Sequence, residues 1–194
     1  MLRHLFLLLI AVMLVGCKAD DWRTADISDK LPSLDFELVD ENGRTVTEQD
    51  YAGKPAVVFF GYTHCPDVCP TTLARLMQIT RQLDASDREA FRVLFVSVDP
   101  KRDTPQTLTT YTNAFGPQFI GLTGDKEQLD DVTNRFRVSY SYGEPDADGN
   151  YDVSHAAAVI AFDARGNAQF LTRDSDPVEA VKADLEHLID ASRG

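Results

Sequence analysis

Three short apolar segments constrain the fold of this chain more than any other feature. Residues 55–60, 93–98 and 156–162 read PAVVFF, VLFVSV and AAAVIAF. Strands with almost no polar face are typical of a sheet that is covered on both sides. Segments whose apolar residues recur at helical spacing lie between and after them, so the sequence predicts an α/β domain in which strands and helices alternate.

Spacing and turn residues supply the remaining elements. Four helices are expected, after residue 70, from about residue 104, around residues 129–136 and at residues 178–188, with further strands at 119–122 and 168–171. The pairs Asn42-Gly43 and Asp148-Gly149 mark two β-hairpin turns. The order βαβ followed by ββα predicts a thioredoxin-like fold: a mixed central sheet flanked by helices, with added N-terminal and internal β-hairpins.

The N-terminal segment has the pattern of an export signal. Residues 1–16 combine Arg3 with an apolar run that is too short to span a bilayer. Leu14-Val15-Gly16-Cys17 resembles a bacterial lipobox, which predicts cleavage before Cys17 and lipidation of that residue. We expect a lipidated cysteine and flexible tether at 17–33, a folded domain at 34–194, and a lipid-anchored, periplasm-facing protein of the bacterial cell envelope, at the inner membrane.

The charge of the chain narrows the classes of partner. The formal net charge is −12 over 194 residues, and the acidic residues are scattered. A nucleic-acid-binding protein needs clustered Lys and Arg, so this class is not expected. An acidic surface suits cations or basic proteins, and it also serves simple solubility.

Two cysteines carry the chemistry that the sequence suggests. With Cys17 assigned to lipid, Cys65 and Cys69 remain, in the segment GYTHCPDVCP between a buried strand and a helix start. The positive end of a helix dipole favours a thiolate, expected here at Cys69 at least. The pair could form a disulfide, reduce a partner's disulfide or hold a metal. Three residues separate the cysteines, whereas thioredoxin-type oxidoreductases have two, and the wider loop favours metal.

A third ligand must come from one of four histidines. His4 belongs to the signal segment, His187 is expected on a helix surface, and His64 diverges from neighbouring Cys65 and is placed near the site without ligating. His155 lies at the mouth of the 156–162 strand, whose start faces the cysteine turn in this topology. It is either a ligand or a loop histidine. Two thiolates and one imidazole suit three-coordinate Cu(I), while zinc would take a fourth ligand.

Three segments in order, GYTHCPDVCP, SVDPKRDTP and YDVSHAAAVIAFD, give the chain a resemblance to the Sco/SenC family of copper chaperones. The resemblance covers residues 34–188 and implies copper, as Cu(I) and in a second state Cu(II), bound by Cys65, Cys69 and His155. It implies a role in supplying copper to the binuclear copper centre of cytochrome c oxidase subunit II or to another copper-accepting protein, or in reducing that centre's cysteines. A periplasmic copper donor or thiol reductant would be a further partner.

The same resemblance suggests residues that support the ligands. Asp99 ends a buried strand within the second segment and is expected beside the site, with helix capping or loop bracing as the other interpretation. Ser154 stands where many relatives carry Asp, and Asp152 could serve in its place.

Other functions compete for the same cysteine pair. The chain could be a thiol-disulfide oxidoreductase, or a redox or copper sensor, and a metallochaperone would not itself be an enzyme. Peroxiredoxins of this fold have Thr three positions before the reactive cysteine, where Tyr62 and Pro66 occur here, so peroxidase activity is not favoured. A binding module with a structural Cys65–Cys69 disulfide would take up no metal after mild reduction.

Overall fold

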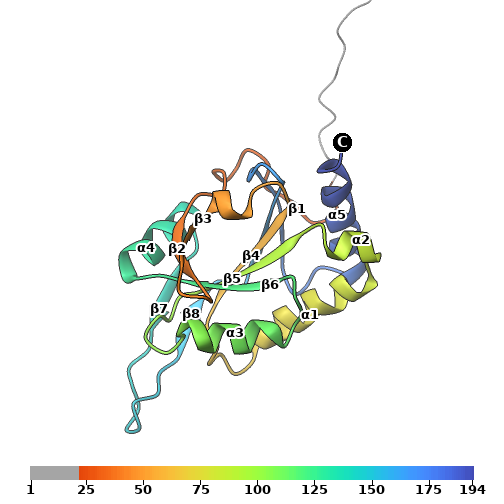
Figure 1. The fold of residues 1–194 in the computed structure, drawn as a ribbon. Helices are drawn as coiled ribbons and strands as arrows, with labels where there is room; N and C mark the ends of the chain where they lie inside the picture. The colour runs from red at the N-terminus through yellow and green to blue at the C-terminus, as the bar shows by residue number, and fades with distance from the viewer. Residues whose placement is uncertain (1–21) are drawn as a thin grey trace, which may run out of the picture.

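An eight-stranded mixed sheet organises the computed structural model, which describes residues 22–194. The strand order is β1-β10-β9-β4-β5-β6-β2-β3, and β7 and β8 form a separate two-stranded sheet (Figure 1). The strands are β1 Ala25–Asp26, β2 Glu37–Asp40, β3 Thr45–Thr47, β4 Ala56–Gly61, β5 Arg92–Ser97, β6 Phe119–Thr123, β7 Tyr140–Tyr142, β8 Val153–His155, β9 Val159–Phe162 and β10 Ala168–Thr172.

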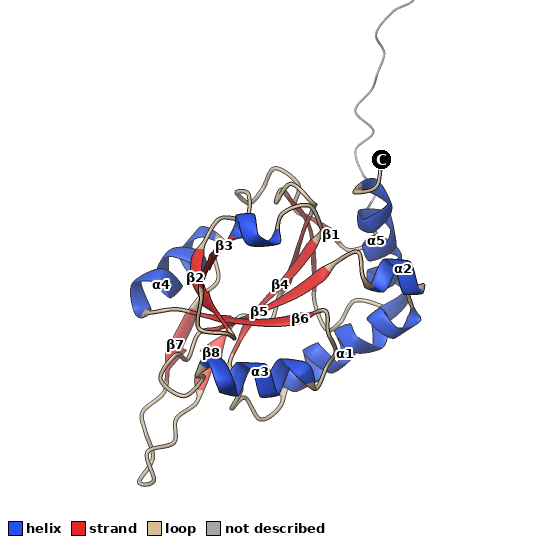
Figure 2. Ribbon diagram, in the orientation of Figure 1, coloured by secondary structure: helices blue, strands red, loops and turns tan. Residues whose placement is uncertain are grey.

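Helices flank this sheet (Figure 2). They are the 3-10 helix η1 Glu48–Tyr51 and the α-helices α1 Val68–Gln82, α2 Ala85–Arg88, α3 Pro105–Asn113, α4 Lys126–Arg135 and α5 Val178–Ala191. Helices α1 and α5 pack against each other, α3 packs against β6, and α4 packs against β2. Among residues 22–194, no helix combines the length and the apolar character needed to cross a bilayer.

Strand β4 lies in the interior of the sheet, between β9 and β5, and each of its six residues is buried. It pairs in parallel with β5, where Gly61 faces Ser97, and antiparallel with β9, where Phe59 faces Val159. Such a strand needs apolar side chains on both faces, as the sequence predicted. The pairing brings the residues that follow β4, those that follow β5 and those that precede β9 to one edge of the sheet.

Residues 22–33, expected to belong to a flexible tether, are part of the folded domain. Strand β1 pairs with β10, and the Trp22 side chain is 8% exposed and packs on Phe170 with 5.0 Å between ring centroids. The buried carboxylate of Asp184 accepts hydrogen bonds from the backbone N–H groups of Arg23 and Thr24. Backbone pairing does not require apolar side chains, so the polar composition of residues 22–33 predicted a tether. The predicted signal segment and Cys17 lie outside the described residues.

Two predicted boundaries also change. Helix α1 begins at Val68, so Cys69 lies in its first turn rather than before it. His155 ends β8 and pairs with Tyr140 instead of opening the next strand, which begins only at Val159. The short elements η1 and α2 were not predicted, since four residues are too few to show a period.

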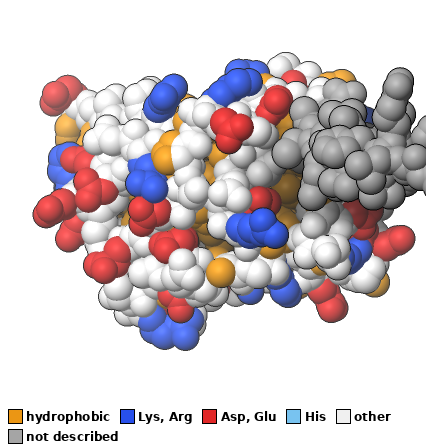
Figure 3. All heavy atoms as spheres, turned by 90° about the horizontal axis from the view of Figure 1, so that it is seen from above, with side chains coloured by type: hydrophobic (Ala, Val, Ile, Leu, Met, Phe, Trp, Pro, Cys, Tyr) orange, Lys and Arg blue, Asp and Glu red, His pale blue; other side chains and the backbone are white. Residues whose placement is uncertain are grey.

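The face of the molecule drawn in Figure 3 carries acidic and basic side chains that are interspersed. Lys and Arg residues stand singly among Asp and Glu there. A nucleic-acid-binding surface instead gathers its cations in one patch. This face therefore has the character of a solvated protein surface.

The contact between residues 23–24 and helix α5 predicts a stability effect. We expect Asp184→Ala to lower the free energy of unfolding by about 2 kcal/mol or more, because it leaves the N–H groups of Arg23 and Thr24 and the Thr24 hydroxyl without their charged acceptor. Urea denaturation followed by circular dichroism measures this. Asp190→Ala, at an exposed position of the same helix, is the matched control and should change little. Equal effects of the two substitutions would contradict the docking of residues 22–24.

Candidate metal centre

A buried carboxylate shapes the turn between β4 and α1. Asp103 is fully buried and accepts hydrogen bonds from the Thr63 backbone N–H at 2.8 Å, the Thr63 hydroxyl at 2.6 Å and the Ser97 hydroxyl at 2.6 Å. Three donors compensate for the removal of this charge from water. Since Ser97 ends β5 and Thr63 follows β4, Asp103 joins the cysteine loop to the neighbouring strand.

The two cysteines differ in their surroundings. Cys69, in the first turn of α1, is fully buried, whereas Cys65 in the preceding loop is partly exposed, and both are free thiols. The backbone N–H of Cys69 donates to Cys65 Sγ at 3.4 Å. A Cβ atom on Gly61 would approach Cys69 Sγ to 2.7 Å and the Phe95 ring to 2.8 Å, so only glycine fits at the end of β4. The backbone of β4 thus lies directly against the Cys69 thiol.

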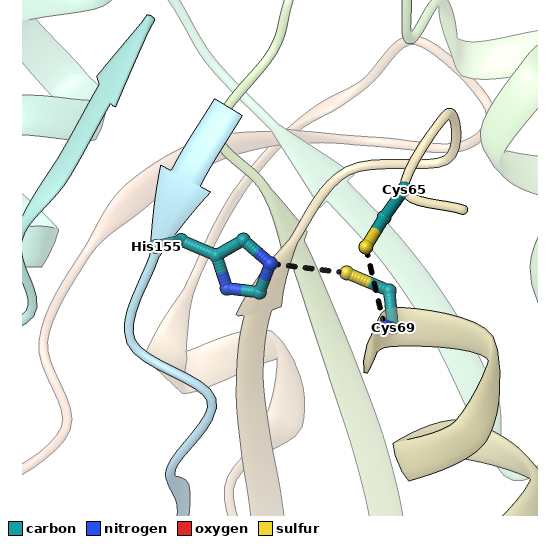
Figure 4. A group of neighbouring side chains, drawn as sticks. All are labelled: Cys65, Cys69 and His155. Carbon is teal, nitrogen blue, oxygen red and sulfur yellow. Dashed lines mark hydrogen bonds between the residues drawn. The ribbon is translucent and has the colours of Figure 1, made fainter. Parts of the chain in front are cut away.

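His155 reaches the cysteines from strand β8 (Figure 4). Its Nε2 lies 3.2 Å from Cys69 Sγ, and its Nδ1 lies 3.2 Å from the Ala156 carbonyl oxygen. A carbonyl can only accept, so Nδ1 carries the proton in the neutral ring and Nε2 presents its lone pair to the cysteines. The rings of Phe59 and Tyr62 flank the imidazole edge-on, at 6.0 and 5.9 Å. This arrangement orients the histidine as a metal ligand is oriented.

The three donor atoms together form one group. The sulfurs of Cys65 and Cys69 and a nitrogen of His155 all lie within 4.8 Å of one another. Two thiols and one imidazole at this spacing can close around a single soft metal ion, for which thiolate and imidazole are preferred ligands. They can also act in thiol-disulfide exchange.

Burial and hydrogen bonding shift the pKa values of the two thiols and the imidazole in different ways. Burial raises the pKa of the Cys65 thiol, but N–H groups of the α1 start, chiefly that of Cys69, outweigh it and the pKa falls below its usual value. Burial dominates at Cys69 and raises its pKa strongly. Burial also lowers the pKa of His155 despite the backbone hydrogen bonds that oppose it, so the imidazole is neutral at neutral pH. The expectation of a favoured thiolate at Cys69 is therefore wrong for the metal-free protein, and the helix start stabilises the Cys65 thiolate instead.

The predicted supporting residues lie around this group in different ways. Asp99 is fully buried, pairs with Arg102 and accepts a hydrogen bond from the Tyr151 hydroxyl at 2.7 Å. His64 is half exposed and turns its Nδ1 toward Thr63 Oγ1, at 3.1 Å, rather than toward the thiols. Asp152 is exposed, and its backbone carbonyl accepts from Gly143. Their supporting roles stay predictions.

Sequence reasoning missed three residues that shape the site. Asp103 and Arg102 occur within SVDPKRDTP, and Gly61 directly follows the apolar strand run. The only signal for Gly61 was a glycine at the point where a strand meets a reactive turn. The partners of Asp103 and Arg102 lie up to about fifty positions away, so no local pattern reveals them.

Comparison with known proteins agrees with this geometry. The sequence profile of SCO1/SenC matches residues 25–190. This chain belongs to the SCO1/SenC family. It is 39% identical to an SCO2-like protein of Rickettsia conorii over 151 residues, which cover 76% of this chain and 73% of the relative. It is 41% identical to the mitochondrial SCO2 homolog of Bos taurus over 68% of this chain, a match that spans only 50% of the longer bovine protein.

Solved structures of the family share the fold. The structure of Bradyrhizobium japonicum ScoI with copper bound matches with a TM-score of 0.72 and 38% identity, over 80% of this chain and 98% of that one. The predicted thioredoxin-like architecture and the family resemblance are both confirmed. The SCO1/SenC match begins at residue 25, at strand β1, which agrees with a folded domain that starts before residue 34.

The unequal thiols predict unequal reactivity. At neutral pH, iodoacetamide should alkylate Cys65 roughly tenfold or more faster than Cys69, because each unit of pKa changes the thiolate population about tenfold and only Cys65 is open to solvent. Since the pKa of Cys65 is lowered, its fast reaction should persist to lower pH than that of a free cysteine. Peptide mass spectrometry over time measures both rates. In urea the two rates should converge, and equal rates in the folded protein would contradict the asymmetry.

Proposed function

We propose that this chain binds copper through Cys65, Cys69 and His155 and passes it to a copper-accepting protein. The observation that carries the proposal is the convergence of the two sulfurs and the imidazole nitrogen within 4.8 Å. Two soft thiolates with one imidazole suit Cu(I), with Cu(II) as a second state that the imidazole also accommodates. The copper bound in the related ScoI structure supports the same cargo here.

Delivery would proceed by ligand exchange at the open side of the site. Cys65 is partly exposed, so an incoming thiolate can replace it at the metal while Cys69 and His155 still hold the ion. For the acceptor we propose the binuclear copper centre of cytochrome c oxidase subunit II, on the strength of family membership. A periplasmic copper donor would load the site.

Such an acceptor requires a location outside the cytoplasm. We propose that Cys17 is lipidated and tethers the domain to the periplasmic side of the inner membrane. The export-signal pattern at residues 1–16 supports this, and Trp22, the first residue that the structure describes, is already buried in the folded domain. The anchor would then hold the domain close to membrane-bound oxidase subunits.

Copper stoichiometry and X-ray absorption test the copper site. We expect one Cu(I) per wild-type chain, with two sulfur ligands and one nitrogen. His155→Ala should lose the nitrogen and at least about tenfold in affinity, since even groups that only support ligands contribute 10–100-fold. His187→Ala is the matched control, because it removes a histidine of helix α5 whose ring packs on Trp22, with 5.1 Å between centroids, and not on the cysteines. Unchanged copper affinity after both His155→Ala and Cys65→Ser would overturn the proposal.

A second function, reduction of a partner's disulfide, is favoured by the unequal thiols. The Cys65 thiolate would attack the partner's disulfide and release one partner thiolate. Cys69 would then lose its proton and attack Cys65 Sγ, which releases the second partner thiolate and leaves a Cys65–Cys69 disulfide. A periplasmic thiol reductant would restore both thiols. A partly exposed cysteine with a lowered pKa, followed by a buried one, fits this sequence of steps.

Trapping separates this function from metal transfer. We expect Cys69→Ser to accumulate a mixed disulfide between Cys65 and an oxidised subunit II domain, and Cys65→Ser to accumulate none. Non-reducing gel electrophoresis with mass spectrometry identifies the linked cysteines. His155→Ala should still reduce the partner, because the sulfur–sulfur bonds form and break at the two cysteines, but loss of the Nε2 acceptor 3.2 Å from Cys69 Sγ should slow the second step. Absence of any adduct with Cys69→Ser would rule out this second function.

A further inference from the structure

The strand that carries His155 stands apart from the main sheet. Within residues 22–194, strands β7 and β8 pair only with each other, and Tyr140 faces His155 in their register. In Figure 1 the loop that joins β7 and β8 extends away from the central strands. No main-sheet ladder holds β8, so side chains must hold the histidine against the cysteines. Positioning of the third ligand is therefore a separate problem from positioning of the two thiols.

One guanidinium makes the main connection to the segment that leads into β8. Arg102 pairs through Nε with the fully buried Asp99, and its Nη1 donates to the Tyr151 carbonyl oxygen at 2.8 Å. Its Cζ also lies 3.7 Å from the centroid of the Tyr151 ring, which is cation–π contact. The Tyr151 hydroxyl closes the arrangement by donating to Asp99. Arg102 thus contacts the backbone and the side chain of a residue four positions before His155.

The cluster is also joined to the core beneath the site. Arg102 Cζ lies 5.5 Å from the centroid of Tyr62, the ring that flanks His155 at 5.9 Å. Asp99 lies two positions after the end of β5, whose parallel pairing with β4 fixes its position relative to the cysteine turn. The Asp99–Arg102 pair is therefore anchored to the rigid sheet at one end and to the hairpin at the other.

We propose that Arg102 is the positioning residue that docks the β7–β8 hairpin and so holds His155 at the cysteine pair. The inference rests on the proposed function, in which His155 is a copper ligand. Tyr140 and Tyr142 attach β7 through Asp130 and the Val98 carbonyl, but both bonds act on the outer strand. Arg102 acts instead on Tyr151, in the chain that enters β8, where the hydrogen bond from the Tyr151 hydroxyl to Asp99 adds to its contacts. Loss of the guanidinium contacts to Asp99 and to the Tyr151 carbonyl should free His155 without disturbing the thiols.

Arg102→Lys tests the docking in the metal-free protein. Lysine keeps a positive charge opposite buried Asp99, so the variant should fold, but it loses the bond to the Tyr151 carbonyl and the planar stacking. We expect amide hydrogen exchange of residues 140–142 and 153–155 to accelerate roughly tenfold, with exchange in β4 and β5 unchanged. Tyr151→Ala, on the partly exposed side of the contact, should accelerate the same amides. Arg44→Lys is the matched control, because Arg44 pairs with buried Asp40 in the other hairpin. Unchanged exchange of the β7–β8 amides in both Arg102→Lys and Tyr151→Ala would overturn the proposal.

A double-mutant cycle tests the effect on the ligand. In the wild-type background, Arg102→Lys should weaken Cu(I) affinity about tenfold or more and reduce the imidazole signal in X-ray absorption. In the His155→Ala background the same substitution should change affinity less than about twofold, since the ligand it positions is gone. An equal loss in both backgrounds would overturn positioning through His155. If His155→Ala alone keeps wild-type affinity, the copper-ligand assignment fails, and the hydrogen-exchange result then decides the docking of the hairpin by itself.

Discussion

The pairing of β4 with its two neighbours is the constraint on which the site depends. Its antiparallel register with β9 ends at Phe59 and Val159, so the chain just before β9 arrives where β4 leads into the cysteine turn. His155 and Cys69, 86 positions apart, come into contact for this reason. The parallel pairing with β5 delivers Asp99 and Asp103 to the same edge, as parallel strands place their carboxyl ends together. One buried strand therefore assembles both the donor atoms and the carboxylates around them.

Packing then decides how each donor behaves. The absence of a side chain at Gly61 lets the Cys69 thiol pack closely against the backbone of β4. This packing buries the thiol and disfavours its ionised form. Cys65 lies in the loop before α1, where N–H groups at the start of this helix stabilise its thiolate. A cation that binds all three donors would offset the cost of a buried Cys69 thiolate, because attraction to the metal replaces the missing solvation. Burial keeps Cys69 protonated in the metal-free protein. Ionisation of this thiol therefore depends on a bound cation.

The sequence predicted the parts of the fold whose signal is local. Strand β4 and strand β5 show continuous apolar runs, and the pattern after residue 70 gave helix α1 to within a few residues. Cys65 and Cys69 were evident from their spacing, but His155 could be linked to them only through topology and family resemblance. Strand β1 escaped detection because it joins the sheet through backbone pairing of two residues. Asp103 and Arg102 escaped because their roles depend on partners from distant segments, and no spacing encodes those contacts.

The site unites donors that are held by different kinds of force. The sulfurs are fixed by the core, through the buried strand β4 and the first turn of α1, and a change in their separation would require repacking of close-packed side chains. His155 belongs to a hairpin that is joined to the rest of the domain by an ion pair, a stacked ring, a few hydrogen bonds and the buried side chain of Val153. The imidazole is therefore the donor that can withdraw at least cost. Under the proposed function, withdrawal of the imidazole would leave a two-sulfur site, which holds Cu(I) less tightly. Under the proposed function, the hairpin therefore sets how firmly copper is held, whereas disulfide exchange would take place at Cys65 and Cys69 themselves.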